Sequence, residues 1–322
     1  MLVTGGGGFI GGHLCAALVA EGARVRALVR YNSRNDHGTL EWLPSDISDE
    51  IEVVLGDLRD PESVATAVAG TELVFHLAAQ IAIPYSYINP RDFFETNVLG
   101  TFNVAQAALA HDVDSLVHTS TSEVYGSAQS APITESHPLE AQSPYAASKI
   151  GADKLVDSFH RSFGLPAVIV RPFNTFGPFQ SARAIVPTIV SQALTGDQLR
   201  LGSLHPRRDM TYVSDTVSGF IAAAGAKAAI GRTIQLGSGA DVSVGELVSL
   251  VADILGRELP IELDESRVRP QDSEVERLIS TPRLAGELTG WTPRTSLREG
   301  LERTIAWIEQ NLARYRADEY VR

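Results

Sequence analysis

The stretch "VTGGGGFIGGHL", residues Val3 to Leu14, decides the fold of this chain. A strand-like apolar run leads directly into a cluster of glycines, and a helix-like apolar pattern follows it. Gly5, Gly8 and Gly11 have the spacing G-x-x-G-x-x-G. Glycine permits a tight turn and a close backbone approach to a ligand, and the N-terminus of the next helix offers N–H donors to an anion. We therefore expect a strand–turn–helix unit that binds the pyrophosphate of a dinucleotide; the alternative is a tight turn without a ligand.

Short apolar runs continue after this unit, namely "RVRALV", "IEVVLG", "ELVFHLAA", "SLVHTS" and "AVIVRPF", with helix-length amphipathic stretches between several of them. Continuously apolar strands joined by helices indicate a parallel sheet covered on both faces, the doubly wound α/β pattern. We assign residues 1–172 to this Rossmann domain and expect 211–240 to return to it. Residues 173–210 and 241–322 are expected to form a smaller, interleaved C-terminal lobe that binds the substrate.

Composition limits the class of protein. The 322 residues are 44% hydrophobic, which suffices for a large core, and the net charge of −12 argues against nucleic-acid binding. No apolar run is long enough to span a bilayer, and no leader pattern is present, so we expect a cytoplasmic protein without membrane contact. The first strand has at most four residues, which leaves open whether residues precede Met1. The single cysteine, Cys15, excludes an internal disulfide, and the scattered histidines suggest no metal.

The second strand bears on the choice between NAD and NADP. An NAD site usually has an acid at the end of this strand, where the sequence has Val29 followed by Arg30. Ser33 and Arg34 are close by. A cationic pocket without an acid suits a 2′-phosphate and favours NADP; the alternative is a solvated basic loop.

"SPYAASK" places Tyr145 and Lys149 four residues apart, on one face of an expected helix. A lysine ammonium beside a phenol lowers the phenol pKa, and a tyrosinate near neutral pH acts as a base toward a sugar hydroxyl. Alone, the pair is more typical of a surface tyrosine and a solvated lysine. It gains weight from the glycine loop and from "TSEVYG", Thr121 to Gly126, at the end of an apolar run.

Several motifs then occur in order: "TGGGGFIG", "HLAAQ", "NVLGT", "STSEVYG", "YAASK", "RPFNTFGP", "RRDMTYVSD" and "LTGWTPRTSLREGLERTIAW". Together they resemble the extended short-chain dehydrogenase/reductase superfamily, the NAD-dependent epimerases and dehydratases of nucleotide sugars. Within it, "YNSRNDHGTLEWLP" and "RPQDSEVERL" look most like 4,6-dehydratases of the legionaminic-acid-pathway type. That type is described as NAD-dependent, whereas the similar GDP-mannose 4,6-dehydratases use NADP. The cofactor is therefore expected to be tightly bound NAD(P).

The resemblance implies a set of cofactor-binding residues: Gly5, Gly8, Phe9, Ile10, Gly11, Arg30, Asn32, Ser33, Arg34, Asp57, Leu58, Leu77, Ala78, Ala79, Gln80, Asn97, Tyr145 and Lys149. It also implies catalytic roles for Thr121, Ser122, Glu123, Tyr145 and Lys149. Tyr145 would take the C4 hydroxyl proton, Thr121 would hydrogen-bond that hydroxyl, and Glu123 would remove the C5 proton before water leaves from C6. Ser122 stands where dTDP-glucose 4,6-dehydratases have an Asp, which suggests that Glu123 serves as both base and acid.

The closest alternatives belong to the same superfamily. UDP-glucuronate decarboxylases also carry Thr-Ser-Glu and need an extra Arg, for which Arg267 or Arg269 is available, and 4-epimerases need only the first redox step. A non-catalytic regulator normally loses Tyr or Lys. For the nucleotide-diphosphate sugar, the resemblance implies contacts from Ser86, Asn174, Arg183, Arg208 and Arg269. It also implies a homodimer formed through the helix near Arg91 and the helix that carries Tyr145.

Overall fold

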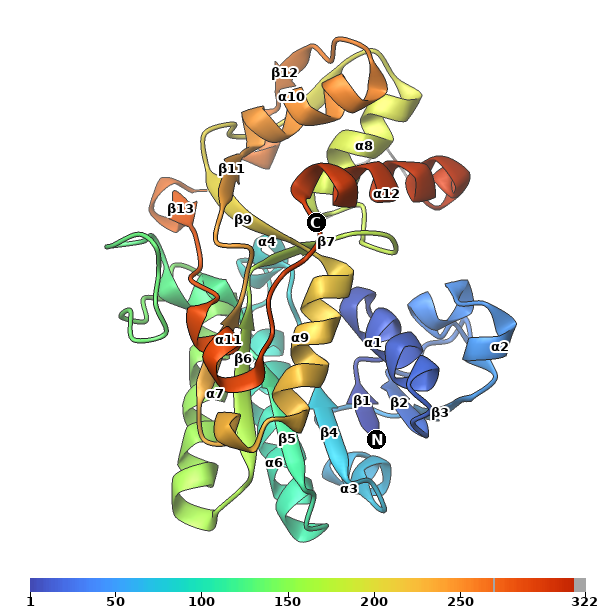
Figure 1. Ribbon diagram of the computed structural model, residues 1–322, viewed down its shortest axis with the longest axis vertical. Coiled ribbons are helices and arrows are strands. Elements are labelled where there is room, and N and C mark those ends of the chain that lie inside the picture. The colour runs from blue at the N-terminus through green and yellow to red at the C-terminus, as the bar shows by residue number, and fades with distance from the viewer. Residues whose placement is uncertain (269, 316–322) are drawn as a thin grey trace.

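Seven parallel strands form the central sheet of the computed structural model, which describes residues 1–268 and 270–315 (Figure 1). Their order across the sheet is β10-β6-β5-β4-β1-β2-β3. The strands are β1 (Leu2–Thr4), β2 (Val25–Val29), β3 (Ile51–Leu55), β4 (Leu73–His76), β5 (Ser115–Thr119), β6 (Ala167–Pro172) and β10 (Thr233–Leu236). The runs that the sequence indicated as strands all form strands of this sheet, so the predicted doubly wound fold is confirmed.

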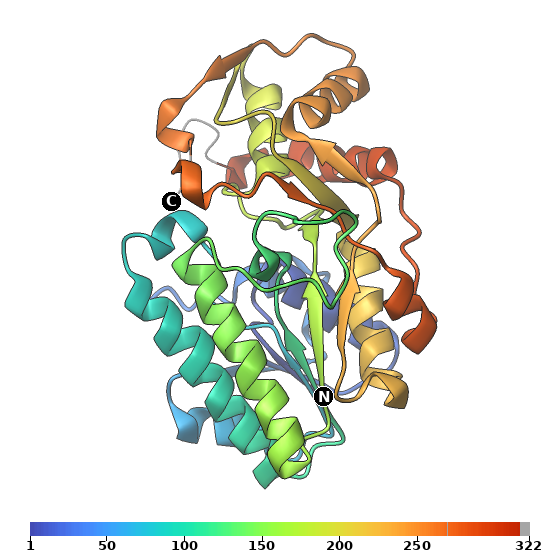
Figure 2. The same cartoon turned by 90° about the vertical axis from the view of Figure 1, so that its left-hand side faces the viewer.

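Helices cover the sheet on both faces (Figure 2). On one face α1 (Phe9–Ala20) packs against α9 (Val213–Gly225), and on the other α6 (Gly100–Ala110) packs between α3 (Pro61–Val68) and α7 (Pro144–Phe163). Consecutive residues of β5 enter different cores, because Val117 packs on the α1 and α9 side and Leu116 on the α3 and α6 side. Side chains alternate across a strand, so a strand between two helix layers is apolar at every position. This explains the continuous apolar runs in the sequence.

The direction of strand addition reverses beside β1, which pairs with β2 on one edge and with β4 on the other. The connections that follow β1 and β4 therefore leave in different directions. In doubly wound sheets such a reversal opens a crevice at the carboxyl ends of the strands, where ligands bind.

A smaller lobe lies above the carboxyl ends of the central sheet, at the top of Figure 1. Its main strand, β9 (Arg207–Tyr212), pairs with β7 (Asn174–Phe176), β11 (Asp241–Ser243) and β13 (Arg277–Leu278). β8 (Leu199–Leu201) pairs with β12 (Ile261–Leu263). The helices of this lobe are α8 (Ile185–Thr195), α10 (Val244–Leu255) and α12 (Leu297–Gln310), and they pack on one another. Ser243 and Ser296 cap α10 and α12, since each side chain accepts a first-turn N–H.

The remaining elements are short and lie mostly in connections. α11 (Arg283–Thr289) returns to pack on α9 and β10. The others are η1 (Gly38–Trp42), α2 (Ser45–Ser48), α4 (Ile83–Ser86), α5 (Pro90–Phe94), η2 (Glu95–Leu99), η3 (Ser122–Tyr125), η4 (Lys227–Ala229), η5 (Glu265–Arg267), η6 (Gln271–Ser273) and η7 (Leu312–Arg314). Across residues 1–268 and 270–315, no helix combines the length and apolar character that a bilayer crossing requires.

Candidate active site

A cavity of about 870 Å³ lies at the carboxyl ends of the central strands, where the sheet order reverses. Its wall is formed by residues that follow β1, β2, β3, β4, β5 and β6. The segment 180–184, which leads into α8, closes it on the side of the smaller lobe. One cavity therefore touches both the sheet domain and the lobe.

The glycine loop between β1 and α1 fits a pyrophosphate. Gly5 has φ +73°, which disfavours any other residue, and a Cβ on Gly11 would lie 2.1 Å from the Gly5 carbonyl oxygen. Gly8 is the N-cap of α1 but contributes no side-chain cap, and the first turn of α1 contains no acid. The unpaired N–H groups of a helix start attract anions. The predicted residues Gly5, Gly8, Phe9, Ile10 and Gly11 all line the cavity here.

The adenosine end of the expected cofactor site follows β2 and β3. The predicted residues Arg30, Asn32, Arg34, Asp57 and Leu58 line the cavity; Ser33 does not. Asp36 also lines it, and its carboxylate lies 3.7 Å from the Arg34 guanidinium. The expectation of an acid-free pocket is therefore wrong. The sequence has no acid next to Val29, but the loop after β2 places the Asp36 carboxylate at the cavity.

The loop after β4 forms the opposite wall. Leu77, Ala78, Ala79 and Gln80 line the cavity, as predicted. Asn97, on η2, is buried and does not line it. Instead its side chain holds the Gln80 peptide at two points, accepting from Gln80 N at 2.8 Å and donating to Gln80 O at 2.9 Å. Asn97 thus acts on the site through Gln80.

The predicted catalytic residues divide into two groups. Thr121, Glu123 and Tyr145 line the cavity, whereas Ser122 and Lys149 are buried and do not. Thr121 caps η3 by accepting the Glu123 N–H at 3.2 Å, which fixes the turn that presents Glu123. Tyr145 lies in the first turn of α7, which starts at the capping residue Ser143 with a proline next to it. In the described part of the chain, Glu123 forms no ion pair with another residue.

Burial dominates the ionisation of the Tyr145 and Lys149 pair. It raises the pKa of Tyr145, against the effect of a hydrogen bond with Thr121, and the Glu123 carboxylate raises this pKa further. Burial also lowers the pKa of Lys149 to about 8. The Lys149 ammonium donates to the Thr119 carbonyl at 2.7 Å. The expectation that Lys149 lowers the Tyr145 pKa is not met in this structure, where desolvation raises this pKa and Lys149 is not among the groups that shift it.

The predicted substrate contacts are brought to the cavity only in part. Asn174, at the start of β7, and Arg183 line it. Ser86 is fully buried and its hydroxyl donates to the Ile83 carbonyl at 2.7 Å. Arg208 lies on β9, where its guanidinium is 3.5 Å from the Glu274 carboxylate, and is not part of the lining. The fifth predicted contact, Arg269, lies outside the described residues.

Several lining residues were not predicted from the sequence. An apolar wall formed by Ile81, Ala82, Ile83 and Pro84 follows Gln80, and Arg59 follows Leu58. The signal for the wall was the apolar run directly after "HLAAQ". No local signal marked Arg59, because its role depends on contacts with a distant helix, described below. Among the described residues no group of three or more His, Cys, Asp or Glu is placed to hold a metal ion.

The fold and site define a class of protein, a dinucleotide-binding α/β enzyme with a buried lysine and a cavity tyrosine on one helix. The sequence matches the family described as GDP-mannose 4,6-dehydratase over residues 2–304. It is 32% identical over 317 residues to a dTDP-glucose 4,6-dehydratase of Actinoplanes sp., which covers 97% of this chain and 98% of that protein. It is 34% identical over 314 residues to a UDP-glucose 4-epimerase of Mycolicibacterium smegmatis, with 95% and 97% covered.

A solved structure of the dTDP-glucose 4,6-dehydratase DesIV from Streptomyces venezuelae, a double mutant with NAD bound, superposes with a TM-score of 0.85. It is 32% identical, with 98% of each chain covered. The chain therefore belongs to the NAD-dependent epimerase/dehydratase family of extended short-chain dehydrogenases/reductases. The predicted resemblance is confirmed at this level, and the finer likeness to legionaminic-acid-pathway dehydratases stays a prediction. Family and relatives indicate an enzyme that acts on nucleotide sugars with a nicotinamide cofactor.

Proposed function

We propose that this protein is a nucleotide-sugar 4,6-dehydratase that produces a 4-keto-6-deoxy sugar nucleotide. One observation carries the proposal: the Glu123 carboxylate lines the same cavity as Thr121 and Tyr145, close enough to raise the Tyr145 pKa. An epimerase needs only one acid–base group at C4. A second carboxylate beside it supports a second proton transfer, as dehydration requires.

The chain's own groups perform the proton transfers in this scheme. Tyr145 receives the C4 hydroxyl proton, with Thr121 hydrogen-bonded beside it. The resulting ketone acidifies the C5 hydrogen, which Glu123 removes. NAD(P), held by the glycine loop and the cavity residues after β2, β3 and β4, would supply the hydride acceptor for C4 and the hydride donor for C6, with a nicotinamide charge that would favour the ionised phenol. The Lys149 ammonium, held on the Thr119 carbonyl, contributes charge of the same sign from the protein side.

Glu123 is proposed to act both as base at C5 and as acid toward the departing C6 hydroxyl. Ser122, at the position that is Asp in dTDP-glucose 4,6-dehydratases, is buried and away from the cavity lining. Among Thr121, Ser122 and Glu123, only Glu123 supplies a carboxyl group that reaches substrate. The proton taken from C5 thus leaves with the C6 hydroxyl as water. C5 must regain a proton when C6 gains hydride, and the proton that Tyr145 took from the C4 hydroxyl balances it.

A UDP-glucuronate decarboxylase is the second candidate, since it shares the Thr-Ser-Glu sequence. It requires a cation near the sugar carboxylate, and Arg183 lines the cavity on the side of the smaller lobe. Arg267, considered for this role from the sequence, lies 2.9 Å from Asp264 and is not part of the lining. The apolar wall from Ile81 to Pro84 is less suited to a carboxylate than to a sugar with an uncharged C6.

Product mass separates dehydration from decarboxylation, and chromatography of the sugar nucleotides detects C4 epimers, which have equal mass. The protein is incubated with a panel of nucleotide hexoses and one nucleotide uronate. We expect loss of one water from a hexose. Loss of carbon dioxide from the uronate, with every hexose unchanged in mass, contradicts the dehydratase proposal, and interconversion of C4 epimers alone indicates an epimerase.

Glu123→Gln tests the carboxylate directly. We expect substrate still to reduce the bound cofactor, while dehydrated product forms at least about a hundredfold more slowly, a typical cost of losing a proton-transfer group. Cofactor absorbance reports the first step and product mass the second. Glu140→Gln, an exposed glutamate in the same connection, is the control. Product formation at the wild-type rate by Glu123→Gln rules out this role.

NAD(P) is proposed as the cofactor, and its form follows from the adenosine end of the cavity. Arg30 and Arg34 favour a 2′-phosphate, whereas Asp36 favours a ribose hydroxyl. The mass of the cofactor extracted from purified protein decides between them.

We also propose a homodimer, supported by the exposed apolar side chains of Phe94, Leu99 and Phe163 on α5, η2 and α7. Sedimentation measures this, and cytoplasmic location stays a prediction.

A further inference from the structure

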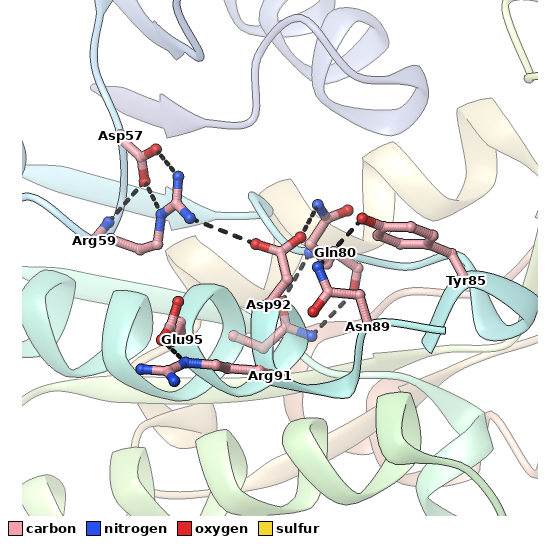
Figure 3. Close-up of polar contacts among 9 residues, drawn as sticks. Asp57, Arg59, Gln80, Tyr85, Asn89, Arg91, Asp92 and Glu95 are labelled. Carbon is pink, nitrogen blue, oxygen red and sulfur yellow. Dashed lines mark hydrogen bonds and ion pairs between the residues drawn. The ribbon is translucent and has the colours of Figure 1, made fainter. Parts of the chain in front are cut away.

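Arg59 joins two walls of the cavity that are not neighbours in the sheet. Its guanidinium forms a two-pronged contact with Asp57, Nε to Oδ1 at 2.9 Å and Nη2 to Oδ2 at 2.6 Å (Figure 3). Its Nη1 lies 3.5 Å from Oδ1 of Asp92, on α5. Asp57 follows β3, whereas α5 follows β4, and β1 and β2 lie between these strands. The Asp57–Arg59–Asp92 link therefore spans the crevice from one side to the other.

The link continues beyond Asp92 into the other wall. The second Asp92 oxygen accepts from the Gln80 amide at 2.6 Å, as Figure 3 shows. The Gln80 peptide is itself held by Asn97, and Asn97 donates to the Ser148 hydroxyl on α7 at 2.9 Å. Ser148 in turn donates to the Tyr145 carbonyl at 2.7 Å. A series of contacts thus runs from Asp57 to the first turn of α7, the helix that carries Tyr145.

The contacts of Arg59 differ from those of ordinary surface ion pairs. The side chains of Arg59 and Asp57 are each 35% exposed, and that of Asp92 is 16% exposed. Arg91, next to Asp92 in the chain, is by contrast 86% exposed and pairs with Glu95 one turn along the helix. The bond to Arg59 is also the main reason that the pKa of Asp57 lies below its usual value. A two-pronged guanidinium contact fixes the orientation of a carboxylate, which an exposed pair does not.

Asp57 and Gln80 both line the cavity, but neither is fixed by its own backbone alone. Asp57 lies in the connection that follows β3, and its neighbour Leu58 is held through its carbonyl by Asn103 at 2.8 Å. The side chain of Asp57 depends on Arg59 for its orientation, and Arg59 depends on Asp92. A cofactor contact from Asp57 is therefore only as well ordered as the Arg59–Asp92 pair.

We propose that Arg59 and Asp92 are positioning residues for the dinucleotide, which orient Asp57 and hold the walls after β3 and β4 at a fixed separation. The inference rests on the cofactor assignment in the proposed function. It assigns binding consequences to Arg59, which lines the cavity beside Asp57, and to Asp92, which reaches the cavity only through Arg59 and Gln80. Losing the pair would weaken binding of the adenosine half of the cofactor while leaving the protein folded.

The test uses ADP-ribose, which has the adenosine and pyrophosphate of the cofactor without the nicotinamide, and calorimetry on the full chain freed of bound nucleotide. Arg59→Gln is expected to raise the dissociation constant for ADP-ribose about tenfold, and Asp92→Asn about threefold, as expected for loss of charge-assisted contacts. The double variant should match Arg59→Gln alone, because both changes break one link. Arg59→Lys keeps the charge without the fork and should recover part of the loss.

Arg91→Gln, next to Asp92 on the same helix, is the matched control and should change the dissociation constant less than about twofold. Wild-type affinity in a folded Arg59→Gln protein, or additive effects in the double variant, overturns the inference. If Arg59→Gln does not fold, Asp92→Asn and Arg59→Lys decide it by the same measurement. A wild-type protein that does not bind ADP-ribose overturns the cofactor assignment and this inference together. Equal binding by the wild type and all variants overturns only the inference.

Discussion

Asp153 and Glu123 are two carboxylates that act on the same phenol, since each raises the pKa of Tyr145, yet they lie in opposite environments. Asp153 is 2% exposed and is held by protein groups, accepting from Arg171 at 2.9 Å and from Ser120 at 2.8 Å. Glu123 lines the cavity. One carboxylate is held inside the protein through its Oδ2, and the other faces the space where substrate is proposed to bind.

The groups around Asp153 form a buried polar cluster next to the candidate site. His118 lies 3.3 Å from Asp153, and burial lowers the pKa of His118 to about 4, so its ring is neutral at pH 7. Arg171 also donates to the Tyr125 hydroxyl at 3.0 Å. The comparison teaches that polar residues around one phenol differ by their partners. Those held by protein groups stabilise the fold, and those that line the cavity are the candidates for chemistry.

Tyr145→Phe tests the cavity side of this comparison and has the largest expected effect on activity. It removes the group proposed to receive the C4 proton, so both cofactor reduction and product formation should fall about a thousandfold. Stopped-flow absorbance of the cofactor measures the first step. Glu123→Gln should retain that step, which separates the two roles. Cofactor reduction at the wild-type rate in Tyr145→Phe contradicts the assignment of the base.

Asp153→Asn tests the buried side of the comparison between Asp153 and Glu123. Arg171 would lose its buried counter-charge, and removing one partner of a buried pair costs about 3 to 5 kcal/mol of unfolding free energy. Urea unfolding measures this cost. Asp157→Asn, one turn further along α7, removes an exposed pair with Arg161 and should cost less than about 1 kcal/mol. Equal losses in the two variants would show that the Asp153 cluster is not a stability element.

The sequence predicted those parts of the site that depend on local structure. The glycine loop, the strand runs and the Tyr145 turn follow from residue spacing and strand pattern, and the structure brings the glycines and Tyr145 to one cavity. Each of these features is determined within a few residues of the chain.

Features that depend on side-chain direction were not predictable in this way. Ser86 points into the protein rather than the cavity, because its hydroxyl bonds within α4. Asp36 reaches the adenosine pocket through a loop whose path no periodicity encodes. The Arg59–Asp92 link joins segments 33 residues apart in sequence. The ionisation of Tyr145 depends on burial, a property of the assembled fold rather than of the "YAASK" motif.

Lys149 adds a third case to this comparison, because it is a buried charge that is proposed to act on the cavity tyrosine. Its pKa is about 8 in the folded protein, against about 10.4 in an unfolded chain, so the fold favours its neutral form. Below pH 8 the ammonium is charged in both states and folding bears the full cost of burying it. Between pH 8 and about 10 the unfolded chain holds the proton more tightly, so this cost diminishes as pH rises.

The prediction concerns the difference in unfolding free energy between wild type and Lys149→Met at several pH values. From pH 8 to 9.5 the wild type should gain about 1 to 2 kcal/mol relative to the variant, which has no ammonium to bury. Urea unfolding of both proteins in matched buffers measures the gain, and taking the difference cancels groups that titrate equally in both. A pH-independent difference would mean that Lys149 keeps an ordinary pKa and that its contact with the Thr119 carbonyl offsets its burial.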